Sequence, residues 1–127
     1  MLRTTGVAFA ALLLQAAPAA MAAPPPVAPS TGYYAVVDTH GNLVRGSSGT
    51  AAIHAGTGNV IVTFPVDVTN CSYDATLARA IRHGGAEERA GFISVVRSAI
   101  YATGVFVDIR GPNNKPHDRP FHLFVAC

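Results

Sequence analysis

The segment that most constrains the fold is 60–68, in which every second side chain is apolar. The positions that share this face are Val60, Val62, Phe64, Val66 and Val68. A period of two is typical of a β-strand that packs one face on a core. Pro65 interrupts the segment on the other face and has no N–H to donate to a neighbouring strand. The pattern therefore predicts a strand at the edge of a sheet, or one that is bulged at Pro65.

Further short β-like runs follow one another along the chain, separated by residues that favour turns. The segments predicted as strands are Tyr33–Asp38, Leu43–Arg45, Thr50–Ala55, Val60–Val68, Cys71–Leu77, Phe92–Arg97, Gly104–Arg110 and Pro120–Cys127. The first two form a hairpin through the turn residues 39–42. Residues 78–90 are predicted as a loop that contains at most a single helical turn. About eight short strands with this spacing predict an all-β fold, either an antiparallel β-sandwich or a jelly-roll-like arrangement.

The first 22 residues have the pattern of a secretory signal peptide. Arg3 supplies the positive start, 7–14 is almost wholly apolar, and Ala20-Met21-Ala22 has the small-x-small pattern of a cleavage site. The apolar run is too short to cross a bilayer of about 30 Å, so no membrane span is expected. Cleavage after Ala22 predicts a secreted, extracellular protein. A Pro-rich spacer, 23–32, then precedes a single domain over 33–127.

The chain has two cysteines, Cys71 and Cys127, and export would place them where disulfides form and persist. Cys127 shares the apolar face of its strand with Phe121, Leu123 and Val125, so it is expected to point inward toward a partner. The sequence therefore predicts a Cys71–Cys127 disulfide. A bridge that closes a loop of this length stabilises a domain by about 4 kcal/mol in the chain-entropy model.

The charge pattern argues against nucleic acid as a partner. Removal of residues 1–22 takes away Arg3 and no other charged residue, so the formal net charge falls from +2 to +1. Lys115 is the single lysine, and the arginines are scattered among acidic residues. A binding surface for phosphates would instead concentrate basic side chains on one face.

Two groups of residues resemble catalytic or metal-binding sets. Asp38 and His40 lie in the first predicted turn, where Ser47 or Ser48 would complete an acid–base–nucleophile set, but turns select Asp and His for conformational reasons. A second set comprises His117, Asp118 and His122. Neither set has the spacing of a known catalytic or zinc motif. No catalytic residue, cofactor or metal is therefore expected, and these residues are retained as surface-site candidates.

Surface recognition is the function that best fits a chain of this kind. Tyr33 and Tyr34 point to opposite faces of their strand, so at least one of them, with Tyr34 as the candidate, is expected to be exposed. The leading hypothesis is a secreted, non-enzymatic module that binds a surface, a glycan or another protein. The alternatives are a structural component that self-assembles through a β edge, and a small secreted hydrolase that uses one of the two sets above.

Segments from both halves of the chain share a pattern with one family. They are Tyr34–Asp38, Gly41–Gly46, Gly58, Val62–Phe64, Val68–Cys71, Gly104–Val107 and Asp118–Cys127. Over residues 33–77 and 104–127 the chain resembles a family of small secreted bacterial domains that are rich in β-structure and have two cysteines. The resemblance implies a bacterial, exported β domain with one disulfide, and it transfers no catalytic residue.

Overall fold

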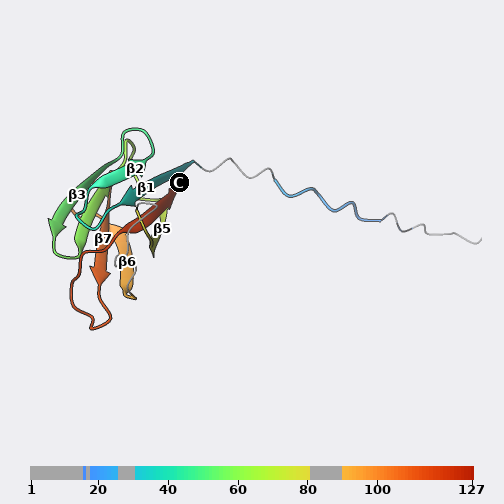
Figure 1. The fold of residues 1–127 in the computed structure, drawn as a ribbon. Coiled ribbons are helices and arrows are strands. Elements are labelled where there is room, and N and C mark those ends of the chain that lie inside the picture. The colour runs from blue at the N-terminus through green and yellow to red at the C-terminus, as the bar shows by residue number, and fades with distance from the viewer. Residues whose placement is uncertain (1–15, 17, 26–30, 81–89) are drawn as a thin grey trace, which may run out of the picture.

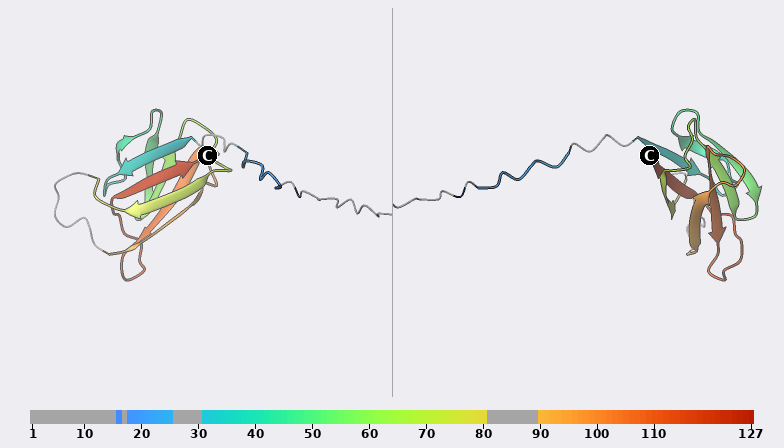
Figure 2. Two further views of the ribbon diagram at one scale, coloured as in Figure 1. Left: turned by 90° about the vertical axis from the view of Figure 1, so that its right-hand side faces the viewer. Right: turned by 180° about the vertical axis from the view of Figure 1, so that it is seen from behind.

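The computed structural model describes residues 16, 18–25, 31–80 and 90–127, and these form an all-β structure (Figure 1). Its eight strands are β1 (Gly32–Val37), β2 (Leu43–Gly46), β3 (Ala51–Gly56), β4 (Asn59–Thr63), β5 (Ser72–Leu77), β6 (Phe92–Arg97), β7 (Gly104–Arg110) and β8 (Phe121–Ala126). They pair in two antiparallel sheets with the orders β2-β1-β8-β5 and β3-β4-β7-β6. Figure 2 shows β8 between β1 and β5. The predicted antiparallel β-sandwich is confirmed.

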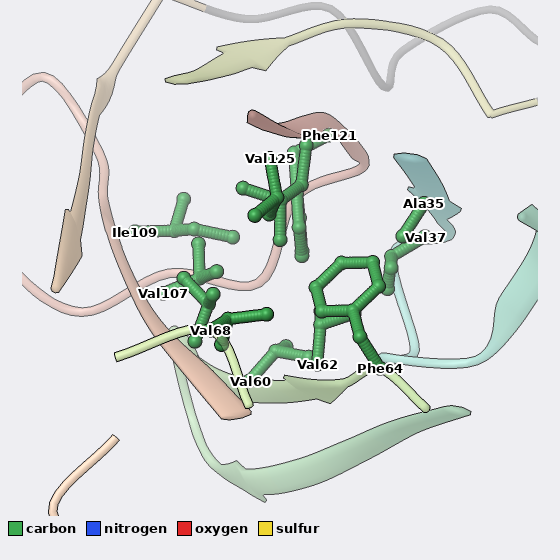
Figure 3. Packing of buried hydrophobic residues seen from close by; sticks show 12 residues of the cluster. Ala35, Val37, Val60, Val62, Phe64, Val68, Val107, Ile109, Phe121 and Val125 are labelled. Carbon is green, nitrogen blue, oxygen red and sulfur yellow. The ribbon is translucent and has the colours of Figure 1, made fainter. Parts of the chain in front are cut away.

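The core lies between the sheets and is built by the alternating residues of the four central strands together with Phe64 and Val68 of the β4–β5 connection (Figure 3). Each central strand has a paired strand on both sides and the other sheet above its inner face, so its inward side chains are buried. The buried cluster comprises Ala35, Val37, Val60, Val62, Phe64, Val68, Val105, Val107, Ile109, Phe121, Leu123 and Val125. The edge strands contribute side chains that are only partly buried, such as Tyr73 of β5 and Val95 of β6.

Three hairpins stay within a sheet and the remaining connections cross between the sheets. β1–β2, β3–β4 and β6–β7 are hairpin pairs. The chain changes sheet after β2, β4, β5 and β7. In consequence, the β1–β2 turn, the β3–β4 turn and the long β7–β8 connection lie close to one another, as the contacts described below show.

The prediction for residues 60–68 was wrong in two respects. The ladder ends at Thr63, and β4 is a central strand rather than an edge strand. Pro65 lies beyond the ladder, where its missing N–H costs nothing, and the N–H of Phe64 donates to the carbonyl of Thr103 at 2.9 Å. Phe64 and Val68 remain buried, so the alternation correctly indicated which residues enter the core while overestimating the length of the strand.

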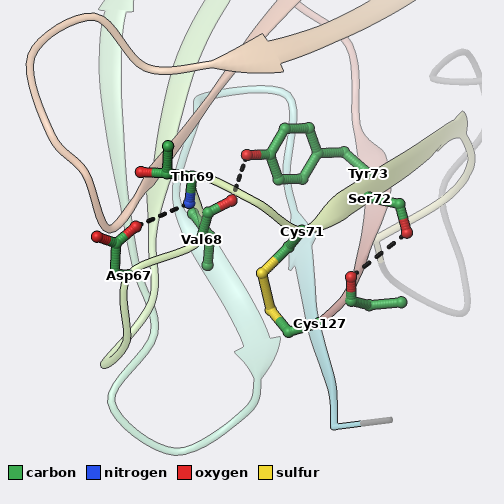
Figure 4. The surroundings of a disulfide bond; sticks show 8 residues. Asp67, Val68, Thr69, Cys71, Ser72, Tyr73 and Cys127 are labelled. Atoms are coloured by element: carbon green, nitrogen blue, oxygen red, sulfur yellow. Dashed lines mark hydrogen bonds between the residues drawn. A yellow bond between two sulfur atoms is a disulfide. The ribbon is translucent and has the colours of Figure 1, made fainter.

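The predicted disulfide joins Cys71 and Cys127, with the two Cα atoms 4.4 Å apart (Figure 4). Cys71 directly precedes β5 and Cys127 directly follows β8, and these strands are paired through Ser72 and Ala126. Cys71 packs against the core, whereas Cys127, which was expected to point inward, is exposed at the end of the chain. The hydroxyl of Tyr73 donates to the carbonyl of Val68 next to the bridge.

Three sequence predictions fall partly or largely outside the described residues. Most of the proposed leader, 1–22, and the middle of the spacer are not described, nor are residues 81–89 of the predicted loop. In the described part of that loop, Ala78–Ala80 contains no strand or helix. None of the described residues forms a helix long and apolar enough to cross a membrane.

Candidate functional site

The first candidate set, around Asp38 and His40, does not form a catalytic site. The side chains of Asp38 and Ser47 instead accept hydrogen bonds from the backbone of the β1–β2 hairpin. A carboxylate oxygen of Asp38 accepts hydrogen bonds from the backbone N–H groups of His40 and Asn42, at 2.8 and 2.9 Å. The hydroxyl oxygen of Ser47 accepts the backbone N–H of Tyr34 at 2.9 Å. Asp38 therefore binds the main chain of His40 and not its ring, which is the arrangement of a capped turn.

The hydrogen bonds to Asp38 make the stability of the fold depend on pH. Burial raises the pKa of Asp38, but the bonds from Asn42 and His40 outweigh it, so the pKa lies below its ordinary value of 3.8. A carboxyl group with a lowered folded-state pKa stabilises the fold above its unfolded-state pKa, and this stabilisation is lost as the pH falls through the folded-state value.

We therefore expect Asp38→Asn to flatten the acid side of the stability profile. The wild type should be more stable than the variant at neutral pH, and the difference should shrink below about pH 4 as the wild-type carboxyl is protonated. Urea unfolding at a series of pH values measures this difference. Parallel profiles for the two proteins would contradict the proposed role of the Asp38 carboxylate.

The second candidate set is also dispersed. His122 lies on the outer face of the β2-β1-β8-β5 sheet, where its Nε2 is 2.8 Å from the carbonyl oxygen of Arg79. The backbone N–H of His117 donates to Ile109 at 3.1 Å, and the residue is exposed. Asp118 lies against the β3–β4 hairpin instead. Within the described part of the chain, no group of three or more His, Cys, Asp or Glu residues is placed to hold a metal ion.

Asp118 contacts a histidine that the sequence did not single out. One of its carboxylate oxygens accepts the N–H of Gly58 at 2.6 Å and lies 3.1 Å from Nε2 of His54. Gly41 lies against the same imidazole, since a Cβ atom on this glycine would come within 2.9 Å of the His54 Cδ2. The pair thus connects the β1–β2 turn, the β3–β4 hairpin and the β7–β8 connection. We assign it a positioning role for these three segments.

A different feature occupies the outer face of the β3-β4-β7-β6 sheet. Ile53 is paired with Ile61, Ile61 with Phe106, and Phe106 with Val96. Because directly paired residues of antiparallel strands point to the same side, these four side chains form one apolar row across all four strands. Ile61 is buried by its neighbours, whereas Ile53 and Val96 are exposed.

A groove of about 340 Å³ lies beside this row. Residues from all four strands and from the β6–β7 turn line it, among them Ala55, Ile61, Val96, Ile100 and Phe106. Ser98 shapes the turn, because its Oγ accepts the N–H groups of Ile100 and Tyr101, both at 3.2 Å. Ile100 at the tip of the turn is 73% exposed. We call Ile53, Ile61, Val96, Ile100 and Phe106 the apolar face.

Tyr34, the remaining candidate, is exposed on the opposite side of the sandwich. It is paired with Phe124 of β8, which is also exposed, and Phe124 is paired with Asp74 of β5. Gly32 leaves room for the Phe124 ring, because a Cβ atom there would come within 2.9 Å of it. Two exposed aromatic side chains next to a carboxylate therefore form a smaller surface feature.

Comparison with known proteins assigns neither a family nor a function to the chain. The chain matches no family model, and neither a curated protein nor a solved structure matches it. The geometry of the described residues therefore carries the functional argument.

Proposed function

We propose that this chain is a secreted, non-enzymatic β-sandwich module that binds a protein partner through the apolar face. The observation that carries the proposal is the apolar row through Ile53, Ile61, Phe106 and Val96, with the groove beside it. Large exposed side chains that gather on one face of a small domain are typical of an interaction site. Aliphatic and aromatic side chains of a partner protein are the groups that such a groove accommodates best.

Export is part of this proposal. The leader pattern of residues 1–22, cleavage after Ala22 and the resemblance to secreted bacterial domains support it. The Cys71–Cys127 bridge is compatible with an oxidising compartment.

Glycan binding is the second candidate, and the Tyr34–Phe124 pair favours it. Aromatic rings with a neighbouring carboxylate, here Asp74, offer both a stacking surface and a hydrogen-bond acceptor for sugar hydroxyl groups. The apolar face lacks this combination, because its defining side chains have no polar atoms. The two candidates therefore use opposite faces of the sandwich and are separable by mutation.

The proposed function is tested with peptides selected from a random library on the purified, oxidised protein. We expect selection of apolar peptides whose affinity falls at least about tenfold in Val96→Glu, because the new carboxylate would have to be desolvated on binding. Phe124→Glu is the matched control, since Phe124 is 52% and Val96 57% exposed. It should leave peptide binding unchanged.

Two results would overturn the assignment to the apolar face. One is a set of selected peptides that bind Val96→Glu as tightly as the wild type. The other is loss of peptide binding in Phe124→Glu alone. Binding on a glycan array that Phe124→Glu abolishes and Val96→Glu retains would establish the second candidate in its place.

A further inference from the structure

We propose that a second copy of this chain pairs with the free edge of β3, so that two β3-β4-β7-β6 sheets join into one eight-stranded sheet. This inference rests on the proposed function, because it names a partner for the edge of the apolar face. The partner copy would be related by a twofold axis, and β3 would run antiparallel to its counterpart. Such an interface is self-complementary and closed.

The main chain of β3 is available for this pairing. β3 is the first strand of its sheet and has β4 as its neighbour on one side. Among the described residues, no hydrogen bond from outside β4 reaches the main chain of Ala51–Ala55. An exposed edge of this kind presents a row of unpaired N–H and C=O groups to another strand.

The composition of β3 distinguishes it from the other three edge strands. β2 contains Arg45, β5 contains Asp74 and β6 ends in Arg97. Charged side chains at an edge discourage pairing with another chain. β3 reads Ala-Ala-Ile-His-Ala-Gly and has no Lys, Arg, Asp, Glu or Pro. Of the four edge strands that the structure describes, β3 is thus the one without a charged residue to discourage pairing.

The pleat of the strand also indicates the register. For the two outer faces to remain on one side of the joined sheet, residues of the same face must pair across the axis. Pairing of Ile53 with the same residue of the second copy meets this condition, aligns Ala51 with Ala55 and, unlike a pairing centred on Ala52, places the two Ile53 side chains opposite each other. Shifts toward the C-terminal end would place the axis on the irregular part of β3, between His54 and Gly56.

This register would continue the apolar row through the interface. Each copy contributes Val96, Phe106, Ile61 and Ile53 in that order. The joined sheet would therefore have an uninterrupted row of eight apolar side chains, and the exposed Ile53 would become covered. A bivalent module with two adjacent grooves results, which would increase avidity for a repetitive or dimeric partner.

The test measures the mass of the purified protein by sedimentation equilibrium over a wide concentration range. We expect a dimer for the wild type and a monomer for Ile53→Lys, which places a charge on the edge. Val44→Lys is the matched control and should remain dimeric. Val44 is a β-branched residue on β2, the edge strand of the other sheet, and it is 40% exposed where Ile53 is 42% exposed.

Cross-linking tests the register independently of dimer stability. Paired residues of antiparallel strands have Cα atoms about 4.5–5.5 Å apart, which suits a disulfide. Ile53→Cys should therefore form a covalent dimer on oxidation that reductant dissociates, and Val44→Cys should not. A monomeric wild type at every concentration, or equal cross-linking of the two variants, would overturn the inference.

Failure of this inference is distinguishable from failure of the proposed function. A monomeric wild type whose peptide binding is still lost in Val96→Glu would refute the paired β3 edge and leave the apolar face as a protein-binding site. A dimer disrupted by Ile53→Lys, with peptide binding that Val96→Glu does not change, would refute the apolar face as the peptide-binding site and leave the paired β3 edge.

Discussion

Replacement of both cysteines, Cys71→Ala with Cys127→Ala, is expected to lower the free energy of unfolding by about 4 kcal/mol. The bridge closes a loop between residues 56 positions apart, and its loss releases the unfolded chain from this constraint. For a domain of this size, the thermal midpoint should fall by roughly 15–30 °C. Thermal and urea unfolding under oxidising conditions measure both quantities.

Reduction of the wild type provides the control for this prediction. The reduced wild type should unfold near the midpoint of the double alanine variant, and reductant should have no further effect on the variant. Equal midpoints for the oxidised wild type and the variant would show that the bridge does not stabilise the fold.

Gly58→Ala is expected to destabilise the domain by about 3 kcal/mol, the second-largest effect. Gly58 has a φ of +75°, a conformation that an L side chain adopts only with strain. A Cβ atom there would overlap the carbonyl oxygen of Ile109 and come within 2.9 Å of the backbone nitrogen of His117. Backbone atoms of β7 and of the β7–β8 connection would therefore have to move.

Gly49→Ala is the control that separates the strain of a positive φ from the overlap with backbone atoms. Gly49 has a similar φ of +78°, but its added Cβ would meet only the side chain of Pro65, at 3.1 Å. We expect Gly49→Ala to lower the free energy of unfolding by about 1 kcal/mol, as measured by urea unfolding. A Gly58→Ala variant no less stable than Gly49→Ala would contradict the close backbone packing around Gly58 and Asp118.

The strands could be predicted from the sequence because their signal is local. A period of two and the turn residues between the runs placed all eight strands, since each strand has to present one face to the core. The same signal failed at Pro65, because Phe64 and Val68 are buried although they lie outside β4. Alternation reports burial, whereas the length of a ladder depends on where the partner strand ends.

Neither the His54–Asp118 contact nor the apolar face could be predicted, because both bring together residues that are far apart in the sequence. His54 and Asp118 are 64 residues apart and belong to no recognised motif, so their contact follows from how the β7–β8 connection lies on the β3–β4 hairpin. The residues of the apolar face come from four strands and one turn. Ile61 and Phe106 look like ordinary strand residues until the register aligns them.

Export and oxidation are premises of the proposed extracellular binding module, and the intact mass of the purified protein tests them most directly. The mass should correspond to a chain that begins at Ala23, and alkylation should add nothing until the protein is reduced, when two thiols should react. A mass that includes residues 1–22 would contradict cleavage of the leader and thus secretion. Two thiols that react without reductant would contradict the Cys71–Cys127 bridge.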